Sequence, residues 1–211
     1  NFNVVDGQGG STAATTTFTL AARNDAPERS AGTVENLTVL EDASSTSLGL
    51  TDLAYTPGGG SDEAAQNLSY VVTEIPVGSL GAIATSDGKT IEAGDELTLT
   101  ELQGLSFTAA ANANGSALFR FTIADDSAST DNDGNNNRLV ESININVISV
   151  NDAPELTGEK KKLADGTEDT VYSITASDLL VGYSDIDLTT NPSAGDVLSV
   201  DNLVATGGTI K

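Results

Sequence analysis

The chain has 211 residues, enough for one or two domains. It carries 9 Lys and Arg against 31 Asp and Glu, and the formal net charge of −22 argues against nucleic acid and anionic lipid as partners and favours cations. The absence of His and Cys excludes a Ser-His-Asp triad, a cysteine nucleophile and the usual zinc sites, so we expect no enzyme. No apolar run approaches the ~18 residues of a membrane helix, which predicts no membrane insertion.

A repeat organises the chain. Asn-Asp-Ala-Pro at residues 24–27 recurs at 151–154 with Glu after both copies, an offset of 151 − 24 = 127. Two further landmarks recur at or near this offset: Glu-Asp at 41–42 and 168–169, and Thr-Asp-Leu at 51–53 with Ser-Asp-Leu at 177–179. Self-similarity at a fixed period indicates a tandem array with its boundaries at the repeated linker.

These boundaries divide the chain into five parts. They are the last hairpin of a preceding repeat at 1–23, a linker at 24–27, a complete repeat at 28–150, a second linker at 151–154 and the first part of a following repeat at 155–211. Residues 1–23 are assigned to a last hairpin because Phe2–Asp6 resembles Phe121–Asp125. A lone hairpin is marginally stable, so the two ends should pack against each other, head to tail between chains, or against strands outside this sequence.

Within the complete repeat, apolar residues alternate with polar ones. The period of two runs through residues 68–72, 97–99, 119–123 and 143–147, which predicts strands with one buried face. The alternation slips after Val147, which predicts a β-bulge. Clusters of Gly, Asn, Asp and Ser separate the runs. The sequence therefore predicts an all-β fold of tandem Greek-key β-sandwich modules of the immunoglobulin-like kind.

Acidic and amide side chains gather at both linkers and in later loops, where they suit calcium, which takes about 6 to 8 oxygen ligands. A cysteine-free extracellular chain needs cross-links other than disulfides, and calcium is the common substitute. The alternatives are a Pro-containing turn at each linker and a solvated acidic loop around Asp185 and Asp187. The candidate metal ligands are Asn24, Asp25, Glu28, Glu41, Asp42, Asp131, Asp133, Asn151, Asp152, Glu155, Asp185 and Asp187.

Two loops, 56–66 and 125–138, are longer than a spacer module needs. An immunoglobulin-like sandwich would place both at the end that carries the incoming linker, where they would face each other. Their Gly, acidic and Arg residues suit the C-terminus of a bound peptide, although the loops could instead only grip the preceding module. The candidate ligand-binding residues are Gly59, Gly60, Ser61, Asp62, Glu63, Gln66, Asn135 and Arg138.

The second of these loops contains an Asp- and Asn-rich stretch, residues 131–138. It is not an EF-hand, because Gly134 falls at loop position 4 and Ser142 at position 12. A tight Asx-rich hairpin and an independent calcium loop are both compatible with this composition.

The Asn-Asp-Ala-Pro linkers, the Glu-Asp pair, the segment Tyr183–Asp187 and the strand Phe119–Asp125 resemble the bacterial cadherin-like repeats of giant RTX-type surface adhesins. That resemblance implies secretion to the extracellular cell surface, calcium between and within modules, contact with adjacent repeats, and attachment to cells or surfaces through a peptide or surface protein. The alternatives are a purely structural calcium-rigidified spacer and an accessory segment of a secreted polysaccharide-active enzyme. The last is disfavoured because sugar clefts favour aromatic walls, and this chain has no Trp and only 4 Tyr.

Overall fold

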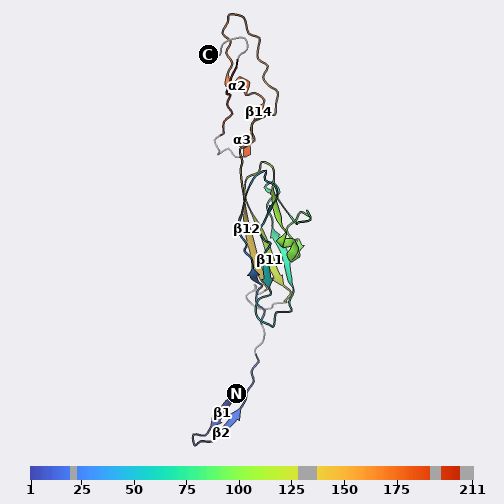
Figure 1. The fold of residues 1–211 in the computed structure, drawn as a ribbon, viewed down its shortest axis with the longest axis vertical. Coiled ribbons are helices and arrows are strands. Elements are labelled where there is room, and N and C mark those ends of the chain that lie inside the picture. The colour runs from blue at the N-terminus through green and yellow to red at the C-terminus, as the bar shows by residue number, and fades with distance from the viewer. Residues whose placement is uncertain (20–22, 128–136, 191–195, 205–211) are drawn as a thin grey trace.

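A computed structural model describes residues 1–19, 23–127, 137–190 and 196–204 of the chain. Figure 1 shows an elongated molecule with three parts in chain order. An N-terminal hairpin of β1 (Phe2–Val5) and β2 (Ser11–Ala14) lies at one end. The complete repeat, which we call the central repeat, lies in the middle, and the C-terminal segment, residues 155–204, lies at the other end.

The central repeat is built from three sheets. The largest has the order β4-β12-β11-β7-β9, with bounds β4 Leu37–Leu40, β12 Arg138–Ile148, β11 Gly115–Asp125, β7 Leu68–Glu74 and β9 Glu96–Leu97. The second has the order β5-β10-β8, with bounds β5 Thr46–Ser47, β10 Ser106–Ala109 and β8 Gly81–Ala84. The third pairs β3 (Glu28–Ala31) with β6 (Ala54–Thr56). Neighbouring strands are antiparallel, except that β4 and β12 are parallel.

One buried apolar cluster joins these sheets. Phe119, Phe121 and Ile123 of β11 are fully buried in the same cluster as Phe107 of β10 and Ile83 of β8. Burial alternates along β11 and β12 because successive side chains of a strand point to opposite faces. The all-β sandwich predicted from the sequence is confirmed, and the Greek-key order of its connections stays a prediction.

The predicted bulge after Val147 is wrong. β12 pairs with β11 as far as Val147 and with β4 as far as Ile148, without a change of register. The strand then ends, and Ile148 and Val150 are 45% and 39% exposed. The apolar pattern slips there because the chain leaves the sheet and enters the linker. A register shift occurs instead between Arg120 and Phe121, where β11 pairs with β7.

The helices of the described residues are short: α1 Leu99–Gln103, α2 Ala176–Leu179 and α3 Asp187–Thr190. α1 begins with a capping box, in which Thr98 and Glu101 each accept a hydrogen bond from the other's backbone N–H. None of the helices in the described part of the chain is long and apolar enough to cross a membrane.

The C-terminal segment begins as the central repeat does. β13 (Glu155–Leu156) follows the second linker and pairs antiparallel with β14 (Tyr183–Ser184), just as β3 follows the first linker and pairs with β6. Asp42 and Asp169, which are 127 residues apart, both have left-handed backbones with φ of 59° and 64°. The repeat seen in the sequence is therefore also a repeat of local backbone structure.

Candidate metal centre

Three carboxylates from three separate segments meet at the second linker. Glu41 follows β4 of the central repeat, Asp152 belongs to the linker and Asp187 begins α3 of the C-terminal segment. One oxygen from each lies within 4.8 Å of the others. Glu41 and Asp187 are buried, with 2% and 3% of their surface exposed, and Asp152 is half-buried. Within the described residues, this cluster of three acidic side chains could hold a metal ion.

Backbone contacts fix the Glu41 side chain. The end of β4 continues its pairing with β12, since the Glu41 N–H donates to the Ile148 carbonyl at 2.9 Å. The Val150 N–H donates to Oε1 of Glu41 at 2.7 Å, so the carboxylate is turned toward the linker. Its other oxygen, Oε2, is buried without a hydrogen-bond partner. An ionised carboxylate oxygen buried without a donor is costly, so this atom fits a cation well.

The linker and α3 are joined by a similar contact. The Asp152 N–H donates to Oδ2 of Asp187 at 2.7 Å, and the Asp187 N–H donates to Oδ1 of Asp185 at 3.0 Å. Oδ2 of Asp152 is buried without a partner, as is Oε2 of Glu41. Two oxygens of the three clustered carboxylates therefore have no hydrogen-bond donor in the protein. A positive ion could bind these two oxygens instead.

The electrostatics of the second linker favour a cation. Desolvation raises the pKa of Asp152 above its ordinary value, and the negative charges of Asp42, Asp187, Asp185 and Glu155 raise it further. None of the ion pairs within the described residues involves the three clustered carboxylates. The repulsion among these acidic groups is thus left for a bound positive ion or for protons to relieve.

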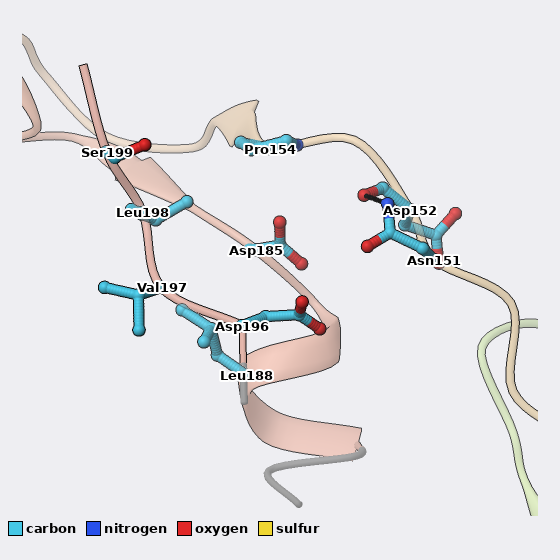
Figure 2. Close-up of a pocket in the computed structure, with 9 residues that line it drawn as sticks. All are labelled: Asn151, Asp152, Pro154, Asp185, Leu188, Asp196, Val197, Leu198 and Ser199. Carbon is cyan, nitrogen blue, oxygen red and sulfur yellow. Dashed lines mark hydrogen bonds between the residues drawn. The ribbon is translucent and has the colours of Figure 1, made fainter. Parts of the chain in front are cut away.

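A cavity of about 230 Å³ adjoins this group on the side of the C-terminal segment. Figure 2 shows the carboxylates of Asp152, Asp185 and Asp196 around it, with Pro154 and Leu188 among its other walls. Asp185 was predicted as a ligand, whereas Asp196 was not. The Asp side chains that line the cavity add negative charge at the second linker.

The first linker repeats part of this arrangement. Asn24 and Asn151 each donate from Nδ2 to the carbonyl of the following Asp, at 3.1 and 2.9 Å. The Asp25 N–H donates to Oε1 of Glu63 at 2.6 Å, as the Asp152 N–H does to Asp187. Glu63 thus takes the place of Asp187, at an offset of 187 − 63 = 124 instead of 127. Its Oε2 is also buried without a partner.

Amide groups surround the first linker as well as carboxylates. Gln66 donates from Nε2 to Oδ1 of Asn24 at 2.8 Å, and Asn24 donates from Nδ2 to Oδ2 of Asp125 at 3.2 Å. A Cβ on Gly59 would lie 2.6 Å from Oε2 of Glu63 and 2.9 Å from Oδ2 of Asp25. Only glycine, which has no Cβ, lets the loop backbone come this close to the linker. The first linker is therefore held by the loop of residues 58–66.

Of the other predicted metal ligands, those within the described residues are not among the three clustered carboxylates. Asp42 accepts a hydrogen bond from the Asn112 N–H at 3.1 Å, and Asn151 is exposed next to Asp152. Glu28 and Glu155 are exposed at the starts of β3 and β13. Asp131 and Asp133, with the predicted ligand-binding residue Asn135, lie outside the described residues, so the nature of that loop stays a prediction.

The structure brings the two predicted ligand loops together at the first linker. Asn67 donates to both carboxylate oxygens of Asp126, from its backbone N–H at 3.1 Å and its Nδ2 at 2.8 Å. Glu63 and Gln66 contact the linker. The remaining candidates of these loops within the described residues are exposed: Gly59, Gly60, Ser61, Asp62 and Arg138.

Sequence reasoning did not identify Glu63 and Asp125 as residues that contact the first linker. Glu63 was assigned to a ligand loop, because its equivalence to Asp187 is hidden by the shift of the offset from 127 to 124. Asp125 was predicted as the end of a repeated strand motif and the start of the second ligand loop, and not as a contact of the linker. Its signal is Asp6, which ends the matching motif: both accept a hydrogen bond from the N–H two residues later, at 2.8 Å for Asp6 and 2.9 Å for Asp125.

Comparison with known proteins adds no assignment. No family model matches the chain, and no curated protein or solved structure matches it.

Proposed function

We propose that this chain is a calcium-binding part of a large extracellular surface adhesin, in which an ion at the second linker holds one repeat against the next. The observation that carries the proposal is the group of Glu41, Asp152 and Asp187, with its buried and unpartnered oxygens. The absence of Cys and the net charge of −22 support an extracellular chain that is cross-linked by cations.

The spacing of the three carboxylates suits calcium. Oxygens bind calcium at about 2.3–2.6 Å, so two oxygens on one ion are separated by at most about 5 Å. The separation of up to 4.8 Å among the three ligand atoms fits this limit. Three carboxylates supply three negative charges for two positive ones, and backbone carbonyls and water would complete the shell of about 6 to 8 oxygens. Magnesium demands a smaller, near-octahedral shell and keeps its water, so calcium is the better match.

The first linker supports the same function in an array. Asp25 and Glu63 supply two carboxylates there, next to an unpartnered Oε1 of Gln66. At the first linker, the residue equivalent to Glu41 would lie 127 positions before Glu41, which is outside the sequence. We infer that an adjacent repeat completes the first site, as the central repeat completes the second.

The contacts of the 58–66 loop favour a spacer role for that end of the central repeat. Glu63 accepts a hydrogen bond from Asp25, and Gln66 donates one to Asn24. A peptide ligand that used these atoms of Glu63 and Gln66 would have to displace the linker. A peptide site on the exposed residues Gly59–Asp62 remains a prediction. Immobilised peptides with free C-termini, tested with and without calcium, would detect it by retention of the chain, and equal retention of an Arg138→Ala variant would reject the predicted carboxylate contact.

Calorimetric titration of the chain with calcium tests the proposed function. We expect saturable binding by the parent, and binding weakened at least about tenfold in Asp187→Asn, because one charged ligand is lost while its size is kept. Asp52→Asn, an exposed acidic residue of the central repeat, serves as the matched control and should bind like the parent. Absence of binding by the parent, or equal loss in both variants, would reject the proposal.

A further inference from the structure

A short loop of the central repeat, residues 110–114, reaches across to the C-terminal segment. The loop is fixed near its middle, where the Asn112 N–H donates to Oδ1 of Asp42 at 3.1 Å. At its end, Nδ2 of Asn114 donates to the carbonyl of Thr190, the last residue of α3, at 3.3 Å. This loop therefore joins the central repeat to the C-terminal segment through protein groups, and the contact needs no ion.

The side chain that makes this contact has an unusual neighbour. Asn114 and Gly115 form an Asn-Gly pair, which occurs once in the sequence. An Asn side chain reacts fastest with the backbone nitrogen that follows it when the next residue is glycine, because glycine has no Cβ to hinder the approach. Gly115 is also exposed. The least hindered neighbour therefore follows the one side chain of this loop that holds the C-terminal segment.

We propose that Asn114 is a site of spontaneous deamidation, which breaks the contact of this loop with the C-terminal segment. The Gly115 nitrogen attacks Cγ of Asn114 and forms a five-membered succinimide ring. The bond from Cγ to the side-chain nitrogen breaks, and that nitrogen leaves with the Gly115 proton as ammonia. Water then opens the ring at either of its carbonyls and gives aspartate or isoaspartate. One water is consumed and one ammonia is released, without oxidation or reduction.

Either product removes the hydrogen bond to Thr190. Aspartate places an ionised carboxylate, which only accepts hydrogen bonds, against the carbonyl oxygen that Asn114 had donated to. Isoaspartate also adds one carbon to the backbone directly before Gly115, where β11 begins. Both products add a negative charge next to α3, which itself begins at Asp187, one of the clustered carboxylates. Deamidation should therefore loosen the second linker.

The fold controls when the reaction can occur. Gly115 pairs with Val147 of β12, and its nitrogen has to turn toward Asn114 for the ring to close, so this end of the sheet must open first. Strand ends open at a lower free energy than the core. Calcium at the second linker would oppose the opening, because the Val150 N–H, just after β12, donates to Glu41. This calcium dependence rests on the function proposed above, whereas the site itself does not.

Two other asparagines are matched controls within the same chain. Asn36 and Asn67 also stand directly before a strand, β4 and β7 respectively, as Asn114 stands before β11. Their side chains are hydrogen-bonded as well, Asn36 with the Asn144 N–H and Asn67 with Asp126. Leu follows each of them, and its Cβ hinders the backbone nitrogen. Both should therefore stay intact while Asn114 is modified.

Peptide mapping by mass spectrometry, after weeks in a mildly alkaline buffer, tests the site. In chelator, we expect Asn114 to be deamidated at least about tenfold faster than Asn36 and Asn67. Calcium should slow the reaction at Asn114 at least about threefold. Modification of Asn114 no faster than that of the controls would overturn the proposal. Equal rates in calcium and chelator, although calorimetry shows calcium binding, would overturn the dependence on opening of the linker.

Calorimetric titration measures calcium binding without reference to Asn114, so the two proposals can fail separately. If the chain binds no calcium, the proposed function fails, and the comparison of asparagines in chelator still decides the site. If the chain binds calcium but Asn114 stays intact in chelator, the deamidation site fails alone.

Asn114→Asp reproduces one product and tests its consequence. In chelator, we expect the Asp152 amide to exchange at least about threefold faster than in the parent, as for the loss of one hydrogen bond. Asn67→Asp adds the same charge at the first linker and should leave the Asp152 amide unchanged. The aged parent, which folded before it was modified, should show the same faster exchange as Asn114→Asp. Unchanged exchange in both would overturn the proposed loosening of the second linker.

Discussion

The two linkers share the same four residues and the same local hydrogen bonds, yet their side-chain surroundings differ. At the first linker, Gln66 donates to Asn24, Asn24 donates to Asp125, and the Asp25 N–H donates to Glu63. At the second, the oxygens of three carboxylates meet within 4.8 Å. One linker thus has side-chain hydrogen bonds to its own repeat, whereas the other gathers three carboxylates that could hold a metal ion.

Metal removal should separate the two linkers most strongly. Calcium at a hundredfold excess over its dissociation constant would stabilise the folded chain by about 2.7 kcal/mol, because it binds the folded form alone. We expect melting several degrees higher in calcium than in chelator, a difference lost in Glu41→Gln and kept in Glu63→Gln. Differential scanning calorimetry of the three proteins measures it. If Glu63→Gln abolishes the calcium effect, the first linker binds the ion and the comparison fails.

Gly59 tests whether close approach of the loop holds the first linker. Gly59→Ala places a Cβ against Glu63 and Asp25 at a left-handed φ of 53°, and we expect the central repeat to lose about 2 kcal/mol of stability in urea unfolding.

Two other glycines separate the causes of that loss. Gly49→Ala has a left-handed φ of 75° and nothing near its Cβ, so it should show the backbone strain alone, about 1 kcal/mol. Gly78→Ala has neither and should be neutral within about 0.5 kcal/mol. A cost at Gly59 no greater than at Gly49 would mean that contact with the linker contributes nothing.

Hydrogen exchange compares the matching amides of Asp25 and Asp152, which donate to Glu63 and Asp187. In chelator, we expect the Asp152 amide to be protected about tenfold less than the Asp25 amide, which corresponds to about 1.4 kcal/mol, because repulsion opens the second linker. Calcium should restore its protection. Equal protection of both amides in chelator would show that the second linker needs no ion.

The smallest expected effect comes from converting one linker toward the other. Gln66→Glu replaces the amide that donates to Asn24 by a fourth carboxylate beside Asp25, Glu63 and Asp125, so we expect the folded repeat to lose about 1 kcal/mol of stability in chelator. We expect calcium to protect the Asp25 amide in this variant but not in the parent. Gln103→Glu, which alters an amide bonded to the Leu53 carbonyl far from the linker, controls for the added charge. If calcium also protected the Asp25 amide in the Gln103→Glu control, the response would be due to added charge and not to a carboxylate at the linker.

The all-β class, the internal repeat and the acidity of both linkers could be predicted from the amino-acid sequence alone. Alternation of apolar residues identifies strands because a strand exposes its faces in turn, and β11 and β12 follow it closely. The tetrapeptide Asn-Asp-Ala-Pro marks both linkers in the sequence, and the division into repeats at these linkers stays a prediction. The equivalence of Asp6 and Asp125 was visible as well, since it lies in a short motif with a fixed spacing.

Which acidic residues come together could not be predicted from the sequence, because it depends on how distant segments pack. Glu41 and Asp187 are 187 − 41 = 146 positions apart, and their meeting with Asp152 depends on how β4, the linker and α3 pack, which a local pattern does not encode. Glu63 lies in a loop whose length differs between repeats, so spacing pointed to a ligand face while the folded loop turns its carboxylate to the linker. Loop length changes at little cost in closure entropy, and position along the sequence therefore specifies strands better than it specifies the contacts of loops.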